Sequence, residues 1–186
     1  PTEEYTTTAI NAFGKIEAGT VAAPVYYAAS QLYKNKTKDE EYNEVIEYVD
    51  KEGRTVLKRV QVQAGAPAIN DVNYASTYYI YDDFGNLVCV VPPEAVKRIT
   101  QTTPVSEYFG KTDTQKNDFL KRWAFRYRYD GRKRMTMKQV PGAEPVYMVY
   151  DNRDRLVLTQ DGNQRVFGTK LWTFTKYDEL NRPIAT

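Results

Sequence analysis

Short stretches in which hydrophobic and polar residues alternate recur along this chain and predict β-strands. In residues 122–129 (RWAFRYRY) every second residue is aromatic. Residues 155–160 (RLVLTQ) also alternate between polar and apolar side chains at the start of the stretch. Successive side chains of a strand point to opposite faces of a sheet. We therefore expect Trp123, Phe125, Tyr127 and Tyr129 to face the core, with Arg122, Arg126 and Arg128 on a solvated outer face.

The alternating stretches lead into one recurring turn. It is present in VDKEGR (49–54), YDDFGN (81–86), YDGRKR (129–134), YDNRDR (150–155) and YDELNR (177–182). Three residues after the Asp, four of the five turns carry Gly, Asp or Asn, which tolerate positive φ. This pattern predicts a type I turn followed by one left-handed residue in a bulge, with the Asp carboxylate accepting the backbone N–H two residues on. The predicted turn residues are Asp50, Gly53, Asp82, Gly85, Asp130, Asp151, Asp154, Asp178 and Asn181, and Lys133 fits its position poorly.

The fold class expected from these hairpins is mainly β. Successive antiparallel hairpins would form an extended twisted sheet or a partial β-shell, with one or two short helices in the insertion 92–123. The expected organisation is a polar, partly ordered N-terminal segment (1–30), first hairpins (31–91), a helical and loop insertion (92–123), and tandem hairpins (124–186).

Local signals place the smaller elements. The segment PPEAVKRI (92–99) has prolines and an acid at a helix start, and TDTQKNDFLKRW (112–123) has Thr112 or Thr114 as a cap, so each predicts a short helix. Residues 24–50 predict a hairpin with a charged turn at 34–41. Residues 103–112 are expected to form a loop, and DGNQR (161–165) a hairpin or loop turn.

Composition narrows the chemistry. The chain has no histidine and one cysteine, Cys89, whose apolar neighbours predict a buried strand thiol. Histidine-dependent nucleophiles, histidine-ligated zinc and a cysteine-cluster metal site are thereby excluded. FGKT (109–112) and DFG (83–85) lack the companion residues of a phosphate loop or a kinase. We expect no catalytic residues, no metal and no cofactor.

The block 121–138 offers the main alternative, a binding surface. Its basic and aromatic residues interleave, and Arg126, Arg128, Arg132 and Arg134 are the candidate contacts for an anionic glycan or a cell surface. Rings and guanidinium groups on opposite faces of a strand argue against a stacking site. The net charge of only +2 favours no nucleic-acid partner. The most apolar run, 21–29, is shorter than the about 20 residues that span a bilayer, so we expect no membrane insertion by this segment.

The turn segments resemble the Rhs/YD-repeat family, named for its Tyr-Asp dipeptide. VYMVYDNRDRLVLTQDGNQR (146–165) and YYIYDDFGNLVCVVPPEA (78–95) carry the resemblance most strongly, and IEYVDKEGRTVLKRV (46–60) is similar to a diverged unit. The resemblance implies a segment of a large bacterial exported protein, extracellular or on the cell surface, whose repeats wind into a hollow β-shell around a C-terminal effector or toxin. The family's repeats have no catalytic residues.

This resemblance also suggests the partners. They would be the rest of the parent polypeptide, a C-terminal effector or a cell-surface glycan. Because an isolated piece of a repeat sheet has open edges, we expect those edges to be covered by the helices or by self-association.

Overall fold

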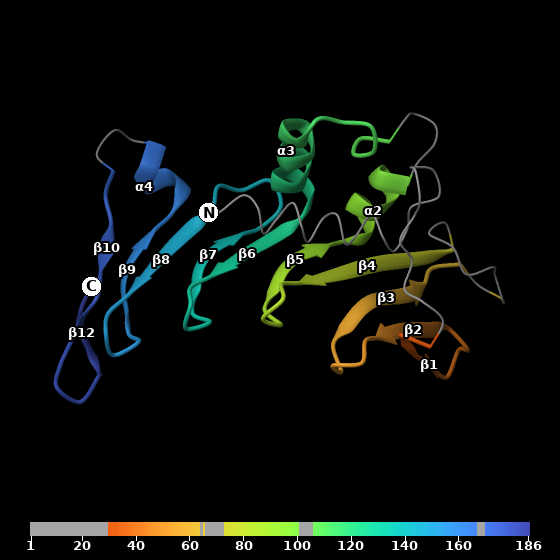
Figure 1. Ribbon diagram of the computed structural model, residues 1–186, viewed down its shortest axis with the longest axis horizontal. Helices are drawn as coiled ribbons and strands as arrows, with labels where there is room; N and C mark the ends of the chain where they lie inside the picture. Colours follow the sequence, from red (N-terminus) through yellow and green to blue (C-terminus); the bar gives the residue numbers. More distant parts are fainter. Residues whose placement is uncertain (1–29, 64, 66–72, 101–105, 167–169) are drawn as a thin grey trace.

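Ten strands form one antiparallel sheet in which each strand pairs with its neighbours in chain order (Figure 1). The computed structural model describes residues 30–63, 65, 73–100, 106–166 and 170–186. The prediction of a mainly-β chain built from antiparallel hairpins is confirmed, and the sheet is an open meander. Its strands are β1 (Tyr33–Lys38), β2 (Glu44–Val49), β3 (Thr55–Gln61), β4 (Tyr74–Tyr81), β5 (Leu87–Val91), β6 (Phe125–Tyr129), β7 (Met135–Gln139), β8 (Val146–Tyr150), β9 (Leu156–Gln160) and β10 (Thr173–Phe174).

A second, two-stranded sheet follows, made of β11 (Lys176–Tyr177) and β12 (Pro183–Ala185). It continues the first sheet with a short break, because the N–H of Thr175, between β10 and β11, still donates to the carbonyl of Val157 on β9 (2.9 Å). The turns after β2, β4, β6, β8 and β11 lie at one end of the strands, and the helices lie toward the opposite end (Figure 1).

The two helices expected in the insertion are present as α2 (Pro93–Thr100) and α3 (Asp113–Trp123). Thr112, rather than Thr114, is the N-cap of α3. Its side chain and that of Gln115 form a capping box, which satisfies two backbone N–H groups at the helix start. Residues 106–112 contain neither helix nor strand, as expected of the loop, whereas 101–105 lie outside the described residues.

These helices and the middle of the sheet share the hydrophobic core. Tyr78 and Val91 from the strands pack with Ile99 of α2 and Leu120 of α3, and each is almost completely buried. Full burial of an aliphatic side chain of this size contributes roughly 1.5–3 kcal/mol. Cys89 lies in the same core with no exposed surface, as predicted, and burial raises the pKa of its thiol to about 12. Its thiol is therefore protonated and unreactive at neutral pH.

The insertion 92–123 does not divide the sheet. β5 precedes it and β6 follows it, and the two strands pair directly through Cys89 with Arg126 and Val90 with Phe125. Whether the segments 31–91, 92–123 and 124–186 act as separate units stays a prediction, and residues 1–29 of the N-terminal segment lie outside the described residues.

The prediction that the arginines of β6 lie on a solvated outer face is wrong. The side chains alternate as expected, but Arg126 is only 4% exposed, lies opposite the buried Cys89, and donates from Nη1 to Oε1 of Gln139 (3.3 Å). Arg128 is half-buried, and so are Tyr127 and Tyr129, which alternate with the arginines and therefore lie on the other face. Alternation separates two faces, but the side on which α2 and α3 pack decides which face is buried.

Two smaller predictions need correction. Residues 162–166 form a short helix, α4 (Gly162–Val166), because the carboxylate of Asp161 accepts the N–H of Gln164 (2.9 Å) as an N-cap does. In the first hairpin, residues 33–38 are strand and the turn occupies 39–43 rather than 34–41.

The helices make their most extensive contacts away from the edge strands of the sheet. α2 packs on β4 and α3 on β6, both in the interior of the sheet. β1 forms one edge, and all six of its residues are exposed, including Lys34, Lys36 and Lys38. Lysines are typical of edge strands that resist pairing with other chains. Self-association through an open edge stays a prediction.

Candidate functional site

The five Asp turns have one shared geometry, which the third turn illustrates. The N–H of Asp130 donates to the carbonyl of Arg134 (3.0 Å), and the N–H of Lys133 donates to the carbonyl of Asp130 (2.9 Å). One carboxylate oxygen of Asp130 accepts the backbone N–H groups of Arg132 and Arg134 (2.9 and 3.0 Å). The carboxylate therefore satisfies two backbone donors that the turn would otherwise leave without partners.

The residue three positions after each Asp is left-handed. Its φ is 80° in Gly53 and Gly85, 61° in Lys133 and Asp154, and 62° in Asn181. The strand pairing shifts by one residue immediately before each Asp, which is the bulge expected of this turn. Lys133 adopts the conformation although a long side chain at positive φ is uncommon.

The side chain four positions after the Asp closes the turn. Nε of Arg134 donates to the second carboxylate oxygen of Asp130 (2.7 Å), and Arg54, Arg155 and Arg182 make the same contact in their turns. In the second turn Asn86 takes this role through its amide (2.9 Å). Burial alone would raise the pKa of the Asp130 carboxyl, but the hydrogen bonds from Arg134 outweigh it and hold the pKa below its ordinary value.

The sequence analysis missed a sixth turn of this kind. Oδ1 of Asp39 accepts the N–H groups of Glu41 and Asn43, Oδ2 accepts the Asn43 amide, and Tyr42 is left-handed with φ 65°. The turn was not recognised because Tyr42 occupies its left-handed position, and an aromatic residue is not expected at positive φ. The signal that was present is the pair of Asp39 with Asn43, at the same spacing as Asp82 with Asn86.

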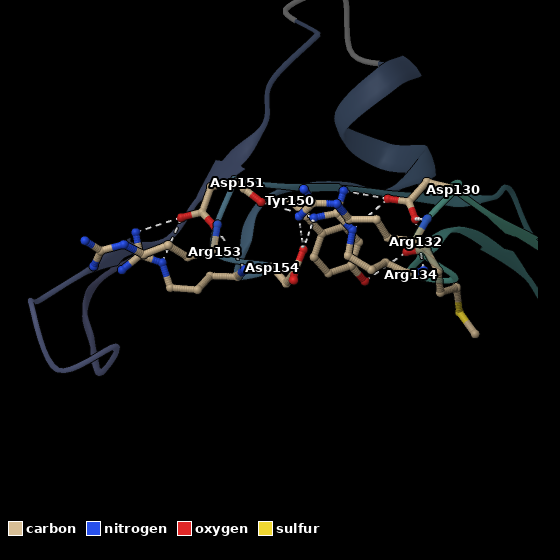
Figure 2. A network of polar contacts seen from close by, with 9 residues as sticks. Asp130, Arg132, Arg134, Tyr150, Asp151, Arg153 and Asp154 are labelled. Atoms are coloured by element: carbon tan, nitrogen blue, oxygen red, sulfur yellow. Dashed lines mark hydrogen bonds and ion pairs between the residues drawn. The ribbon is translucent and has the colours of Figure 1, made fainter.

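Three of these arginines, Arg54, Arg134 and Arg155, also connect their turn to the next Tyr-Asp turn. The register of β7 and β8 places Arg134 opposite Tyr150, the Tyr of the following Tyr-Asp dipeptide. The guanidinium carbon of Arg134 lies 5.0 Å from the ring centre of Tyr150, and the Tyr150 hydroxyl donates to the carbonyl of Met135 (2.9 Å), the residue after the arginine (Figure 2). A cation over an aromatic face is attracted by the electrons of the ring. We call this pair of contacts the Arg–Tyr latch.

Two further junctions have the same latch. Arg54 lies 5.0 Å from the ring centre of Tyr81, whose hydroxyl donates to the carbonyl of Thr55 (3.1 Å). Arg155 lies 5.0 Å from the ring centre of Tyr177, whose hydroxyl donates to the carbonyl of Leu156 (2.8 Å). The recurrence of Tyr-Asp therefore has a structural explanation, because the Asp builds its own turn and the Tyr docks on the preceding one.

The latched arginine also reaches the left-handed residue of the next turn. Nη1 of Arg134 donates to the carboxylate of Asp154 (2.6 Å) and to the carbonyl of Asp151 (3.1 Å). Figure 2 shows its guanidinium group between the two neighbouring turns. Arg155 contacts the side-chain oxygen of Asn181 in the same way (3.1 Å). Asp154 and Asn181 therefore serve their own turn by their left-handed backbone and the preceding turn by their side chain.

One junction lacks the latch. The register of β5 and β6 places Asn86 opposite Tyr129, so no arginine covers this ring, and among the described residues none accepts a hydrogen bond from its hydroxyl. Instead Nζ of Lys133 donates to the carbonyl of Phe84 (2.8 Å). This is the junction spanned by the insertion with α2 and α3, where the hydrophobic core lies.

The candidate binding arginines do not form one exposed patch. Arg126 is buried and Arg128 is half-buried. Arg132 is exposed and pairs with Asp154 (3.0 Å), on which Arg134 also converges. Two of the four arginines thus contact neighbouring turns, and the other two belong to the interior of β6.

A polar cluster on β1, β2 and β4, in which Glu44 and Tyr74 are buried, was also missed. The Glu44 carboxylate contacts the ammonium groups of Lys36 (2.6 Å) and Lys38 (3.2 Å) and accepts the hydroxyl of Tyr74 (3.1 Å). The hydrogen bond from Lys36, together with those from Lys38 and Tyr74, lowers the pKa of Glu44 to about 2 against the opposing effect of burial. The cluster joins three strands, and the alternating lysines of residues 34–38 were the signal for it.

No known family model matches the chain, and no curated protein is significantly similar to it in sequence. The resemblance to the Rhs/YD-repeat family therefore rests on the Tyr-Asp pattern and stays a hypothesis. Within the described ranges, no three His, Cys, Asp or Glu side chains gather as metal ligands would. No helix in the described part of the chain is long and apolar enough to cross a membrane.

Proposed function

We propose that the chain is a non-enzymatic structural segment of a large exported protein of the Rhs/YD-repeat type. It would build part of the wall of a β-shell or surface scaffold that carries a C-terminal effector. The Arg–Tyr latch is the observation that supports this proposal. Tyr, Asp and Arg, which elsewhere serve as binding or catalytic groups, are here used to fasten one hairpin to the next.

The latch suits a wall because it acts between units. Each turn closes by hydrogen bonds within five residues, so it needs no neighbour to form. The ring of the next Tyr and the side chain of the next left-handed residue then fix the neighbouring hairpin at a set distance and angle. A chain of such contacts extends a sheet without requiring a thick hydrophobic core over every strand.

The first test concerns the seam between β7 and β8. Arg134→Gln removes the cation from Tyr150, and we expect amide hydrogen exchange to become several-fold faster in both strands. Arg153→Gln is the matched control, because Arg153 is an exposed arginine of the adjacent turn. Unchanged exchange in Arg134→Gln would refute the latch as a fastening between units.

The second test addresses the alternative of a carbohydrate- or cell-surface-binding module. We expect neither saturable binding to a glycan array nor hydrolysis of common glycan and ester substrates. Saturable glycan binding that Arg132→Gln abolishes would replace the scaffold with an adhesion function. Hydrolysis at an appreciable rate would replace it with an enzyme.

A further inference from the structure

The junction between β5 and β6 has the same strand pairing as a latched junction. In β5–β6 and in β7–β8 the strands pair at two positions, and the first pair lies three residues after the side chain that closes the preceding turn, Asn86 or Arg134. Tyr129 is therefore placed relative to Asn86 as Tyr150 is placed relative to Arg134. The two junctions differ in their side chains and not in their register.

The carboxylate of the second Asp turn has no cationic partner among the described residues. In the third turn, Oδ2 of Asp130 accepts both Nε and Nη2 of Arg134 (2.7 Å each). In the second turn, Oδ2 of Asp82 accepts the neutral amide of Asn86 (2.9 Å) instead. A carboxylate oxygen has two lone pairs, so Asp82 keeps an uncompensated negative charge and one acceptor position.

The aromatic ring at this junction has no cation over it in the described part of the chain. In each latch a guanidinium carbon lies 5.0 Å from the centre of a tyrosine ring. Tyr129 has no such contact, although Lys133 reaches the same junction and donates to the carbonyl of Phe84 (2.8 Å). Burial, with smaller effects of Tyr127 and of the Asp82 carboxylate, raises the pKa of the Tyr129 hydroxyl. The negative charge and the ring without a cation therefore belong to one site.

These features suit a guanidinium group better than an ammonium group. A planar guanidinium group stacks on an aromatic ring while its edge donates to a carboxylate, whereas an ammonium group is a compact and strongly hydrated charge. The three latches all use arginine. Lys133 follows the same rule, because its ammonium group bonds to a carbonyl and not to the ring of Tyr129.

We propose that this junction is a docking site for an arginine side chain of a different polypeptide. Its guanidinium group would lie over the Tyr129 ring and pair with Oδ2 of Asp82, in the geometry that the Arg134 latch shows. A polypeptide is the expected source, because Phe84, in the same turn as Asp82, is 63% exposed and offers an apolar contact beside the site. Arginine and aromatic side chains are typical anchors of protein–protein interfaces. The site lies between two described turns in the middle of the sheet and does not depend on the scaffold proposal.

The probe is a short peptide with one arginine between two leucines, titrated into the ¹⁵N-labelled protein at physiological salt. We expect saturable NMR shifts of the backbone amides of Asn86 and Tyr129, with a dissociation constant in the millimolar range, as one cation–π contact and one charged hydrogen bond provide. Tyr129→Leu should weaken binding about tenfold, because it removes the ring. Asp82→Asn keeps an oxygen for the turn but removes the charge, and it should weaken binding about fivefold.

Two further variants make the outcome specific. Asn86→Arg supplies a guanidinium group from within the chain and should abolish peptide binding, so it decides the matter if Tyr129→Leu fails to fold. Tyr127→Leu is the matched control, because Tyr127 is a half-buried ring two residues before Tyr129 on the same face of β6, and it should leave binding unchanged. Binding that survives either Tyr129→Leu or Asn86→Arg would overturn the proposal, as would the absence of binding to the unaltered protein.

The same titration identifies the source of the cation. Lysine in place of the arginine of the peptide should weaken binding about threefold or more, and equal binding would overturn the assignment to a guanidinium group. Methylguanidine should bind several-fold more weakly than the peptide, and Phe84→Ser should remove that difference. Equal binding of methylguanidine to the unaltered protein would assign the site to a free guanidino compound and overturn the docking of a polypeptide. Sedimentation of the protein alone should show a monomer, whereas a dimer that Tyr129→Leu dissociates would assign the site to a second copy and overturn the proposal.

Discussion

The chain fastens neighbouring hairpins in two different ways. Arg–Tyr latches join β3 to β4, β7 to β8 and β9 to β11, and the strands of the last two junctions are mostly half-buried. Between β5 and β6 there is no latch, and the two strands are instead covered by α2, α3 and a buried hydrophobic cluster. At this junction the apolar core holds the strands together without an arginine, and Asn86 closes its own turn without contacting the next one.

The largest expected effect comes from the core. Leu120→Ala removes a nearly fully buried side chain of α3, and we expect the free energy of unfolding to fall by about 3 kcal/mol, as for other leucines replaced in cores. Leu180→Ala is the control, because Leu180 is 72% exposed, and its effect should stay below about 0.5 kcal/mol. Urea denaturation measures both. Equal effects would mean that α3 does not secure the sheet.

We expect low pH to weaken the hydrogen bonds and ion pairs of the carboxylates before it disrupts the hydrophobic core. The pKa values of Asp39, Asp50, Asp130, Asp151 and Asp178 are lowered in the fold, and that of Glu44 is lowered to about 2. A carboxyl whose pKa is lower in the folded state stabilises fully above its unfolded value, about 4, and loses that contribution as the pH falls through the folded value.

We therefore expect stability to decline from about pH 4 downwards, with hydrogen exchange in β7–β9 rising before that in β4 and α3. Glu44→Gln should reduce the difference in unfolding free energy between pH 7 and about pH 2, because it removes one titrating group. Simultaneous loss of protection in all strands would contradict the distinction between latched and core-supported junctions.

The tyrosine hydroxyls compare the two junctions directly. Tyr150→Phe removes the hydrogen bond to Met135 and should cost about 1 kcal/mol. Tyr129→Phe, at the junction without a latch, should cost less than about 0.5 kcal/mol because its hydroxyl has no such acceptor among the described residues. Thermal or urea unfolding of the two variants gives the comparison, and a reversed order would place the fastening elsewhere.

The last expected effect is a gain in stability. Asn86→Arg introduces an arginine opposite Tyr129 and should stabilise the protein by about 0.5–1 kcal/mol if a latch forms. A crystal structure of the variant, or the NMR shift of the Nε–H of the introduced arginine, would show whether the guanidinium lies over the ring. If stability does not increase, the hydrogen bond from Lys133 to the carbonyl of Phe84 already fastens this junction in place of a latch.

The hairpins were readily predictable, whereas the contacts between them were not. The Asp turn depends on residues within five positions, so its pattern was legible in five of the six turns, and Asp39 was missed only because Tyr42 occupies the left-handed position. The latch joins residues 15 to 27 positions apart only if adjacent strands adopt one particular register. The sequence of a single repeat does not specify the register between neighbouring hairpins. The role of the tyrosine could therefore not be derived from the repeat alone.

The sequence by itself determined the turns, the strands that flank them, the two helices of the insertion and the burial of Cys89. These depend on local hydrogen bonds, on side-chain alternation and on the preference of apolar groups for the interior. The tertiary structure decided which face of β6 is covered, so that Arg126 is buried although its position in an alternating strand suited solvent equally well. It also decided that Tyr150 meets Arg134 and that Arg182 meets no tyrosine of the described residues. A face or a partner is chosen only when strands and helices that are distant in the chain pack together.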